Sequence, residues 1–473
     1  MSVKPLKFKQ FLITSNSEID KKTGKPVTVD LRSGIPRVEY RESVFMPYIE
    51  ITAYGIDTGN TLPADDGTGA GVGLLDGGFG QGTETVQFNI EDEKGNSINL
   101  SRLTDLRVGS WTNDQQGFKN NSFKMTIISK EAFDNTLLKN RCGGDDGLDV
   151  KYSGRISEIA RSIIRLNLRS PKWQSMNTDE SLNEYHAFGQ ARTPFEMILD
   201  LQQLAIPNLQ TSKGKSAKGN TAGYLFFQTA NGYQFRSLDK LFETKDNNTK
   251  DARGKTILRY IENSKSDDDR EDSLPVGFDG KILWSNMSTN VDALSQFENG
   301  AWASKIYVFN DITKKPEIKT LQCDGKGNGI TGGRCLPKLN KDYVDSNGAL
   351  PTVQTHARQA VGQTVIGYDS IEEQVEKTDK INYNNEEIIL QAHQNYRQKM
   401  NMSADIVISA NLSLRAGDLI YLFFPELSTK VTTVGSNTWK NGIYMIADLC
   451  HFVEGVKSFT GLHLVRDAYG VKT

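Results

Sequence analysis

The first part of the chain alternates hydrophobic and polar positions with a period of two. In residues 122–129, for example, Phe123, Met125 and Ile127 fall on one face and the residues between them on the other. Such alternation, in runs rich in Val, Ile, Thr and aromatic residues, is typical of strands. The expected strands are Phe8–Thr14, Val27–Arg32, Val38–Phe45, Tyr48–Ile56, Thr83–Glu91, Thr104–Trp111 and Ser122–Ser129. Many short strands with few helices predict a barrel or a sandwich.

From about Gly154 the hydrophobic period becomes helical. One apolar face is formed by Ile156, Ile159, Ala160, Ile163 and Ile164, which predicts an amphipathic helix.

A second helix is expected from Thr193 to about Ala205. Thr193 is suited to cap its N-terminus, Pro194 fits the first helical position, and Glu196 completes a capping box. Pro207 ends the run.

A hairpin is expected after this helix. Its strands, Tyr224–Thr229 and Tyr233–Leu238, flank Ala230, Asn231 and Gly232, residues that suit a short turn.

Further along, the pattern predicts helices over Asn290–Glu298 and Asn385–Met400, a strand over Trp302–Phe309, and four or five closing strands. Residues 311–380 are polar and rich in Gly, Pro and Asn, which is typical of long surface connections. The chain therefore divides into two β-rich blocks separated by a helical block.

The first β-rich block is interrupted by the glycine-rich segment Gly59–Gly82. Nine glycines make it costly to order. We expect an assembly arm that is not part of the fold and that orders only against another subunit, with Leu74, Leu75 and Phe79 as its apolar anchors. A tolerated flexible loop is the equally open alternative.

Composition and charge exclude several classes of protein. The 473 residues suffice for two to four domains, and 37% hydrophobic with 24% charged residues is typical of a globular protein. The net charge of −2 argues against a general nucleic-acid binder. No apolar run is long enough to span a membrane, and the N-terminus lacks the features of a signal peptide, so synthesis in the cytoplasm is expected.

The cysteines and histidines suggest no metal or disulfide chemistry. Cys142, Cys323, Cys335 and Cys450 are too scattered for a disulfide scaffold, although Cys323 and Cys335 flank a glycine-rich loop and their pairing stays open. The five histidines have no metal-site spacing and are expected to be structural: His186, His356, His393, His451 and His463.

Other motifs have simpler explanations than a ligand site. The glycines of 327–332 match a dinucleotide fingerprint, but no helical pattern follows them. The lysines of Lys213–Lys218 suit a phosphate backbone, and also an exposed soluble loop; the acidic run Asp267–Asp272 suits a solvated loop. Glu50 and Asp57 are one of many possible glycosidase pairs. We therefore expect no catalytic, cofactor-binding or metal-binding residues, no cofactor and no enzymatic activity.

The ordered set of patches resembles the central hub proteins of contractile-phage baseplates, in the T-even-like and cyanophage myovirus family. The order of capped helix, loop, aromatic hairpin and the SLDKLF segment after it is the main resemblance. The other matching patches are Lys151–Leu168, Leu412–Glu426 with its LRAGD turn, Asn441–Val453 and Thr460–Asp467. The likeness covers most of residues 1–57 and 83–473, and the insertion lies outside it.

The resemblance implies an α+β, mainly β fold with two tail-tube-like β-barrels, an intervening α/β domain and a ring-forming assembly. The implied domains are residues 1–148 as the first barrel with its insertion at 59–82, residues 149–218 and 242–299 as a peripheral α/β domain, and residues 219–241 and 300–473 as a discontinuous second barrel with long loops at 311–380.

The resemblance further implies a structural role in the virion tail baseplate. Three copies would form a ring of pseudo-sixfold symmetry between the hexameric tail tube and the trimeric central spike, with a channel for passing DNA. The implied partners are the chain itself, the spike, the tail tube or its initiator, and neighbouring wedge proteins, without sequence-specific nucleic acid. The alternatives are a ring module of a tailocin or type VI-like system and a carbohydrate- or peptidoglycan-cleaving enzyme.

Overall fold

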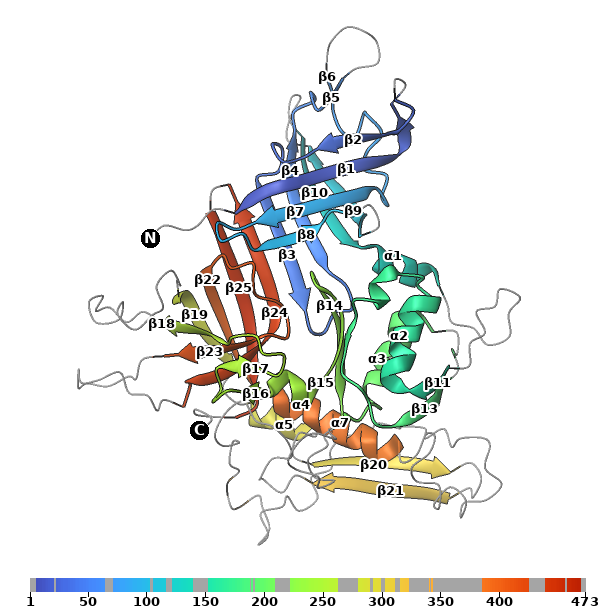
Figure 1. Ribbon diagram of the computed structural model, residues 1–473, viewed down its shortest axis with the longest axis vertical. Helices are drawn as coiled ribbons and strands as arrows, with labels where there is room; N and C mark the ends of the chain where they lie inside the picture. The colour runs from blue at the N-terminus through green and yellow to red at the C-terminus, as the bar shows by residue number, and fades with distance from the viewer. Residues whose placement is uncertain are drawn as a thin grey trace, which may run out of the picture.

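The computed structural model describes residues 6–20, 23–63, 71–102, 105–115, 121–138, 152–187, 189, 192–208, 222–262, 280–289, 292–298, 303–310, 315–322, 340, 342, 385–424, 439–455 and 457–468. Its architecture is mainly β, as the sequence predicts, with few helices (Figure 1).

The first β-rich block is a strongly curved sheet whose inward face belongs to a hydrophobic core that continues into the second block. Its strands are β1 (Lys7–Ile19), β2 (Pro26–Asp30), β3 (Arg37–Ser43), β4 (Glu50–Asp57), β7 (Thr85–Glu91), β8 (Ser97–Leu100), β9 (Leu106–Gln115) and β10 (Asn121–Ser129). They run in the order β2-β1-β7-β9-β10-β4-β3, with β8 beside β7. The inward face carries Phe123, Met125 and Ile127, as the alternation predicts. Strand β8 is the one that the hydrophobic pattern missed.

The second block closes into a barrel of six strands. Its strands are β18 (Leu258–Glu262), β19 (Lys281–Thr289), β22 (Met402–Ser409), β23 (Leu419–Phe423), β24 (Gly442–Glu454) and β25 (Lys457–Arg466). Neighbours pair in the order β24-β23-β18-β19-β22-β25, and β25 returns to β24. A β-barrel in the C-terminal half is therefore confirmed.

The two blocks are one continuous sheet. Strand β3 pairs antiparallel with β24, from Asp448 opposite Ser43 to Glu454 opposite Arg37, so the pairings join 14 strands. The two blocks consequently lie side by side (Figure 1).

A helical unit flanks the sheet. It contains α1 (Lys130–Leu137), β11 (Tyr152–Arg155), α2 (Ile156–Leu166), η1 (Pro171–Trp173), β12 (Asn177–Thr178), β13 (Glu184–Ala187) and α3 (Pro194–Gln202). The predicted capping box is confirmed, since the Thr193 hydroxyl accepts from the Glu196 amide and the Glu196 carboxylate accepts from the Thr193 amide. The apolar face of α2 is fully buried against α3 and the hairpin.

The aromatic hairpin lies between the helices and the barrel. Strand β14 (Tyr224–Thr229) and strand β15 (Gly232–Ser237) pair around the predicted turn. One face, including Phe226 and Phe235, packs on α2 and α3, while Leu225 and Phe227 pack on barrel residues. Both faces of the hairpin are therefore buried, which explains why apolar and aromatic residues occur on each of them.

Two domain assignments from the sequence are wrong. The hairpin pairs with β12 in a separate sheet, so residues 219–241 do not join the strands of the second barrel. Strands β18 and β19, assigned to the peripheral domain, lie in the barrel wall. Local periodicity identifies a strand but not its partner, which long-range pairing decides. The other domain boundaries remain predictions.

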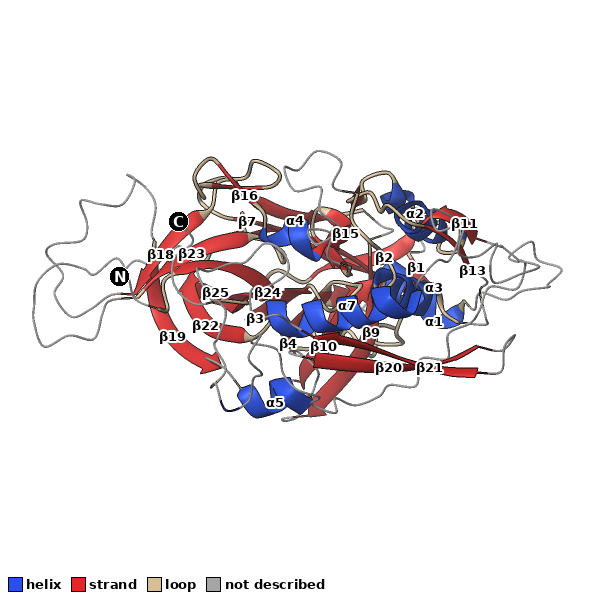
Figure 2. Cartoon of the chain, turned by 90° about the horizontal axis from the view of Figure 1, so that it is seen from below, coloured by secondary structure: helices blue, strands red, loops and turns tan. Residues whose placement is uncertain are grey.

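The remaining elements lie in the lower half of the molecule as drawn in Figure 1. They are α4 (Leu238–Phe242), β16 (Thr244–Lys245), β17 (Lys250–Asp251), α5 (Ala293–Glu298), β20 (Ala303–Asn310), β21 (Lys315–Gln322) and α7 (Asn385–Lys399). Helix α7 contacts the β20–β21 ribbon and α4 (Figure 2). Among the described residues, no helix is both apolar enough and long enough to cross a lipid bilayer.

The described part of the glycine-rich insertion belongs to the fold, contrary to the expected arm. Strands β5 (Leu62–Pro63) and β6 (Gly71–Val72) pair, and the Asp57 carboxylate accepts from the amides of Gly59 and Leu74, the latter at 2.6 Å. Leu74 and Phe79 are each 2% exposed within the core of the first block. Of the three proposed anchors, only Leu75 remains on the surface.

Candidate assembly surface at the junction of the two blocks

Strand β24 pairs with strands of both blocks because a bulge divides it into two segments. Its register with β25 shifts between Ile446 and Asp448, at Ala447. Residues before the bulge pair with β23 and close the barrel, while those after it pair with β3. The Val44 amide donates to the Ala447 carbonyl at 2.9 Å, where the chain passes from one arrangement to the other. A bulge bends its strand and increases the local twist, so it lets one strand belong to two curved sheets.

On the solvent side, the junction is bridged by an arginine between two rings. The Arg37 guanidinium lies 4.9 Å from the ring centroid of Tyr54 in the first block and 4.7 Å from that of Phe452 in the second. Glu39 forms ion pairs with both Arg37 and Arg41. Each cation–π contact contributes about 0.5–1 kcal/mol at such exposed sites.

On the core side, the junction is organised by a buried glutamate. The Glu42 carboxylate on β3 accepts from the Tyr40 hydroxyl at 2.7 Å, from the Ala230 amide of the hairpin turn at 2.7 Å, and from the Ala416 amide at 2.9 Å. The Arg415 guanidinium lies 3.8 Å away. Burial raises the pKa of Glu42, against the lowering effect of Arg415 and these donors. One carboxylate thus ties together the first block, the hairpin and the second block.

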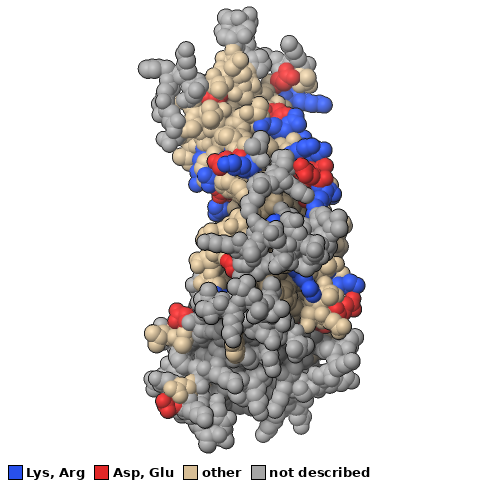
Figure 3. Space-filling view, turned by 90° about the vertical axis from the view of Figure 1, so that its left-hand side faces the viewer, with Lys and Arg blue, Asp and Glu red and all other residues tan. Residues whose placement is uncertain are grey.

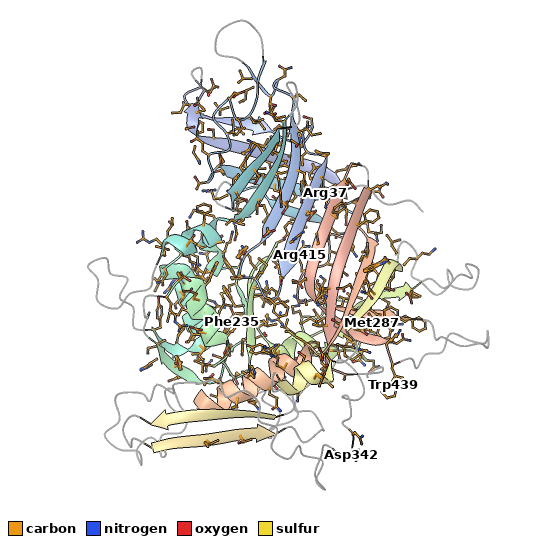
Figure 4. The ribbon with its side chains drawn as sticks, turned by 180° about the vertical axis from the view of Figure 1, so that it is seen from behind. Arg37, Phe235, Met287, Asp342, Arg415 and Trp439 are labelled. Carbon is orange, nitrogen blue, oxygen red and sulfur yellow. The ribbon has the colours of Figure 1, made fainter. Side chains whose placement is uncertain are left out.

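Arg415 belongs to the LRAGD turn that the sequence singled out. Its guanidinium donates to the carbonyls of Leu412 and Leu414, and to that of Ser97 in the first block at 3.4 Å. Figure 4 shows Arg415 below Arg37 along the same junction. Gly417 has a φ of +81°, and a Cβ there would meet Phe227 of the hairpin at 2.9 Å. Glycine is therefore required both by conformation and by space.

A second buried carboxylate holds the turn itself. Asp418 accepts from the Arg415 amide at 2.8 Å and pairs with Arg253 and Lys255 at 2.6 Å each. Removing one member of such a network leaves an uncompensated buried charge.

The described histidines have structural partners. His451 on β24 is fully buried, stacks on Tyr40 and contacts the Thr460 hydroxyl through Nδ1 at 2.9 Å. Burial, with the nearby Arg415, lowers the pKa of His451 to about 3, so its ring is neutral. His463 contacts the Asp405 carboxylate at 2.6 Å.

A groove of about 450 Å³ lies on the solvent face of the shared sheet, beside the junction. Its polar lining includes Arg41, Glu50, Asp405, Asp448 and His463, and its apolar lining includes Trp284, which is 54% exposed. Burial raises the pKa of the Cys450 thiol in its wall. Among the described residues that line the groove, no hydrogen bond joins a thiol or hydroxyl group to the His463 imidazole, which contacts Asp405.

Glu50 and Asp57 are not a catalytic pair. They are the first and last residues of β4, so their Cα atoms are about 23 Å apart. A glycosidase needs carboxyl groups separated by about 5–9.5 Å. Asp57 instead holds the glycine-rich insertion.

Several sequence candidates lie outside the described residues. They are 327–332, Lys213–Lys218, Asp267–Asp272, Cys142, Cys323, Cys335 and His356. Within the described part of the chain, no group of three or more His, Cys, Asp or Glu side chains is placed to hold a metal ion.

Comparison with known proteins gives only distant structural neighbours. No protein-family model and no curated protein matches the chain. A 43 kDa tail protein of prophage MuSo2 from Shewanella oneidensis is 9% identical, with a TM-score of 0.45, covering 98% of this chain and all of that one. A tail protein from Neisseria meningitidis is 8% identical, with a TM-score of 0.45 and coverage of 98% and 97%.

A type VI secretion component from E. coli, itself similar in structure to two tail proteins of bacteriophage T4, is 8% identical with a TM-score of 0.36, covering 99% of this chain and 79% of that one. Because every one of these TM-scores lies below 0.5, the function proposed below depends on the sequence and the fold of the chain itself.

Proposed function

We propose that the chain is a structural hub subunit of a phage tail baseplate. Three copies form a ring that joins a hexameric tail tube to a trimeric central spike and leaves a channel for DNA during ejection. The ring contacts neighbouring wedge proteins, and its role involves no catalysis.

The observation that carries the proposal is the pairing of β3 with β24, which makes two β-rich blocks into one sheet. Each chain would contribute two β-rich blocks to the wall of the ring, so three chains would contribute six blocks. That number suits a hexameric tube on one side and a trimeric spike on the other. The patches that resemble hub proteins include the LRAGD turn, which lies at this junction.

The charge distribution agrees with a wall that DNA passes. The face of β3 that carries Arg37 and Arg41 mixes signs, because the buried Glu39 between them forms ion pairs with both. Lys and Arg also alternate with Asp and Glu on the described surface in Figure 3. A strong basic stripe would retain DNA by counterion release, whereas mixed charge would let it slide past.

Mass measurement and imaging test the proposal. Light scattering of the purified full chain should give about three times 52.6 kDa at moderate concentration, with dissociation on dilution. Class-averaged electron micrographs should show a ring with a central hole. A stable dimer under all conditions, or a monomer even at high concentration, would contradict the hub assignment.

A further inference from the structure

The two β-rich blocks repeat the same strand arrangement. In the first block, β10 lies between β9 and β4, and β4 is followed by β3. In the second block, β25 lies between β24 and β22, and β22 is followed by β19. Strand β9 therefore corresponds to β24, and strand β3 corresponds to β19.

A bulge at the same position supports this correspondence. The register between β9 and β10 shifts between Ser110 and Val108, at Gly109. The register between β24 and β25 shifts at Ala447. In both strands, the residues before the bulge pair with the next strand of their own block, β7 or β23.

After the bulge the two strands differ. Residues 448–454 of β24 pair with β3, whereas residues 110–115 of β9 have no second partner among the described strands. The counterpart of β3 is also incomplete, because only Lys281 and Ile282 of β19 pair with β18, and the rest pairs with β22 alone. An open edge is a row of unpaired backbone donors and acceptors that accepts another strand.

We propose that residues 111–115 of β9 pair antiparallel with residues 285–289 of β19 from a second copy of the chain, in the way that β24 pairs with β3 within one chain. This inference depends on the proposed ring and names the contact that builds it. The two edges are different surfaces on opposite sides of the β3–β24 junction. Repetition of such a heterologous contact closes a ring when the rotation allows it, and in-chain and between-chain junctions would then alternate around the wall.

The in-chain junction also sets the register. Glu39 lies opposite Thr52 in its own block and Phe452 across the junction. In the second block, Asn286 on β19 lies opposite Asp405. Because β19 corresponds to β3, Asn286 is the counterpart of Glu39. Asp114 follows the bulge at Gly109 by as many residues as Phe452 follows the bulge at Ala447, so Asp114 is the counterpart of Phe452. The proposal therefore places Asn286 of one copy directly opposite Asp114 of the next.

Disulfide trapping tests this register. Directly opposed residues of antiparallel strands lie about 4.5–5.5 Å apart, within the range that a disulfide bridges. The full chain carrying both Asp114→Cys and Asn286→Cys should lose its monomer band under mild oxidation and form covalent species of two and three chains, all reversed by reductant. The wild type, with its native cysteines, gives the background.

A matched control uses β2, which lies at one end of the strand order and pairs with β1. The pair Thr28→Cys and Asn286→Cys should stay at the wild-type background. Equal trapping by this control, or a ring-sized assembly without the 114–286 bond, would overturn the edge pairing but leave the ring standing. A chain that scatters light as a monomer at every concentration would overturn both.

Discussion

At the scale of single residues, Glu42 is the side chain that links the first block, the hairpin and the second block. It is fully buried and accepts from groups of β3, the hairpin turn and the LRAGD turn. A buried carboxylate is tolerated only when its oxygens are satisfied, so the positions of these three segments depend on one another.

We expect Glu42→Ala to lower the free energy of unfolding by about 3–5 kcal/mol, because it leaves the Arg415 charge without its counter-ion and three donors without their acceptor. Glu42→Gln keeps the shape and should cost less. Urea denaturation measures both. Glu91→Ala, at the exposed ion pair with Lys9, is the control and should change stability by less than about 1 kcal/mol. An equal loss in Glu42→Ala and Glu91→Ala would disprove the role of the buried network.

His451 predicts a dependence of stability on pH. Its folded pKa of about 3 lies below its ordinary value of 6.5. Between these values the unfolded chain binds a proton that the folded chain does not, so stability falls as the pH is lowered through 6.5 toward 3. The contribution is about 2 kcal/mol between pH 7 and pH 5.

His451→Gln removes this titration and keeps a polar group for Thr460. Its melting temperature should fall less than that of the wild type when the pH is lowered from 7 to 5. Glu42 acts in the opposite direction, because a raised carboxyl pKa means that the folded state holds the proton more tightly and loses stability as the pH rises. Parallel pH curves for wild type and variant would show that His451 is not the group responsible.

At the scale of elements, the glycine-rich insertion is fastened to the first block by a carboxylate and two apolar side chains. Asp57 ends β4 and caps the returning segment, and Leu74 and Phe79 fill the core above it. Gly78 and Gly80 have positive φ values there, which explains part of the glycine content.

We expect Phe79→Ala to lower the free energy of unfolding by about 3–5 kcal/mol. Leu75→Ala, four residues earlier and 40% exposed, should change it by less than about 0.5 kcal/mol. Thermal or urea unfolding of the two variants provides the comparison. A stable Phe79→Ala variant that fails only in tail assembly would instead restore the interpretation of the insertion as an arm.

At the scale of the whole molecule, the proposed function depends on the edges and faces of the sheet and needs no reaction centre. We expect the purified chain to release no fragments from labelled peptidoglycan or polysaccharide, because Glu50 and Asp57 are too far apart and, among the described residues that line the groove, no thiol or hydroxyl group is hydrogen-bonded to His463. Release above background that a single carboxylate substitution abolishes would show the opposite.

Local signals in the amino-acid sequence were enough to define several individual elements. The Thr193 capping box, the turn of the aromatic hairpin and the alternation of β10 were all readable because they depend on neighbours within a few residues. The same holds for the apolar face of α2. These signals sufficed to predict a mainly β chain with a helical block.

Which elements contact one another depends on long-range pairing and packing in the folded molecule. The hairpin joins the helices because both of its faces are buried, and β18 and β19 join the barrel because strands from distant segments complete their pairing. Glu42 is one carboxylate among 58 acidic residues in the sequence, and nothing local marks it, since its partners Ala230, Arg415 and Ala416 lie 188 or more residues away. Leu74 and Phe79 likewise suit a free arm or a core equally well in the sequence, and the packing around them selects the core.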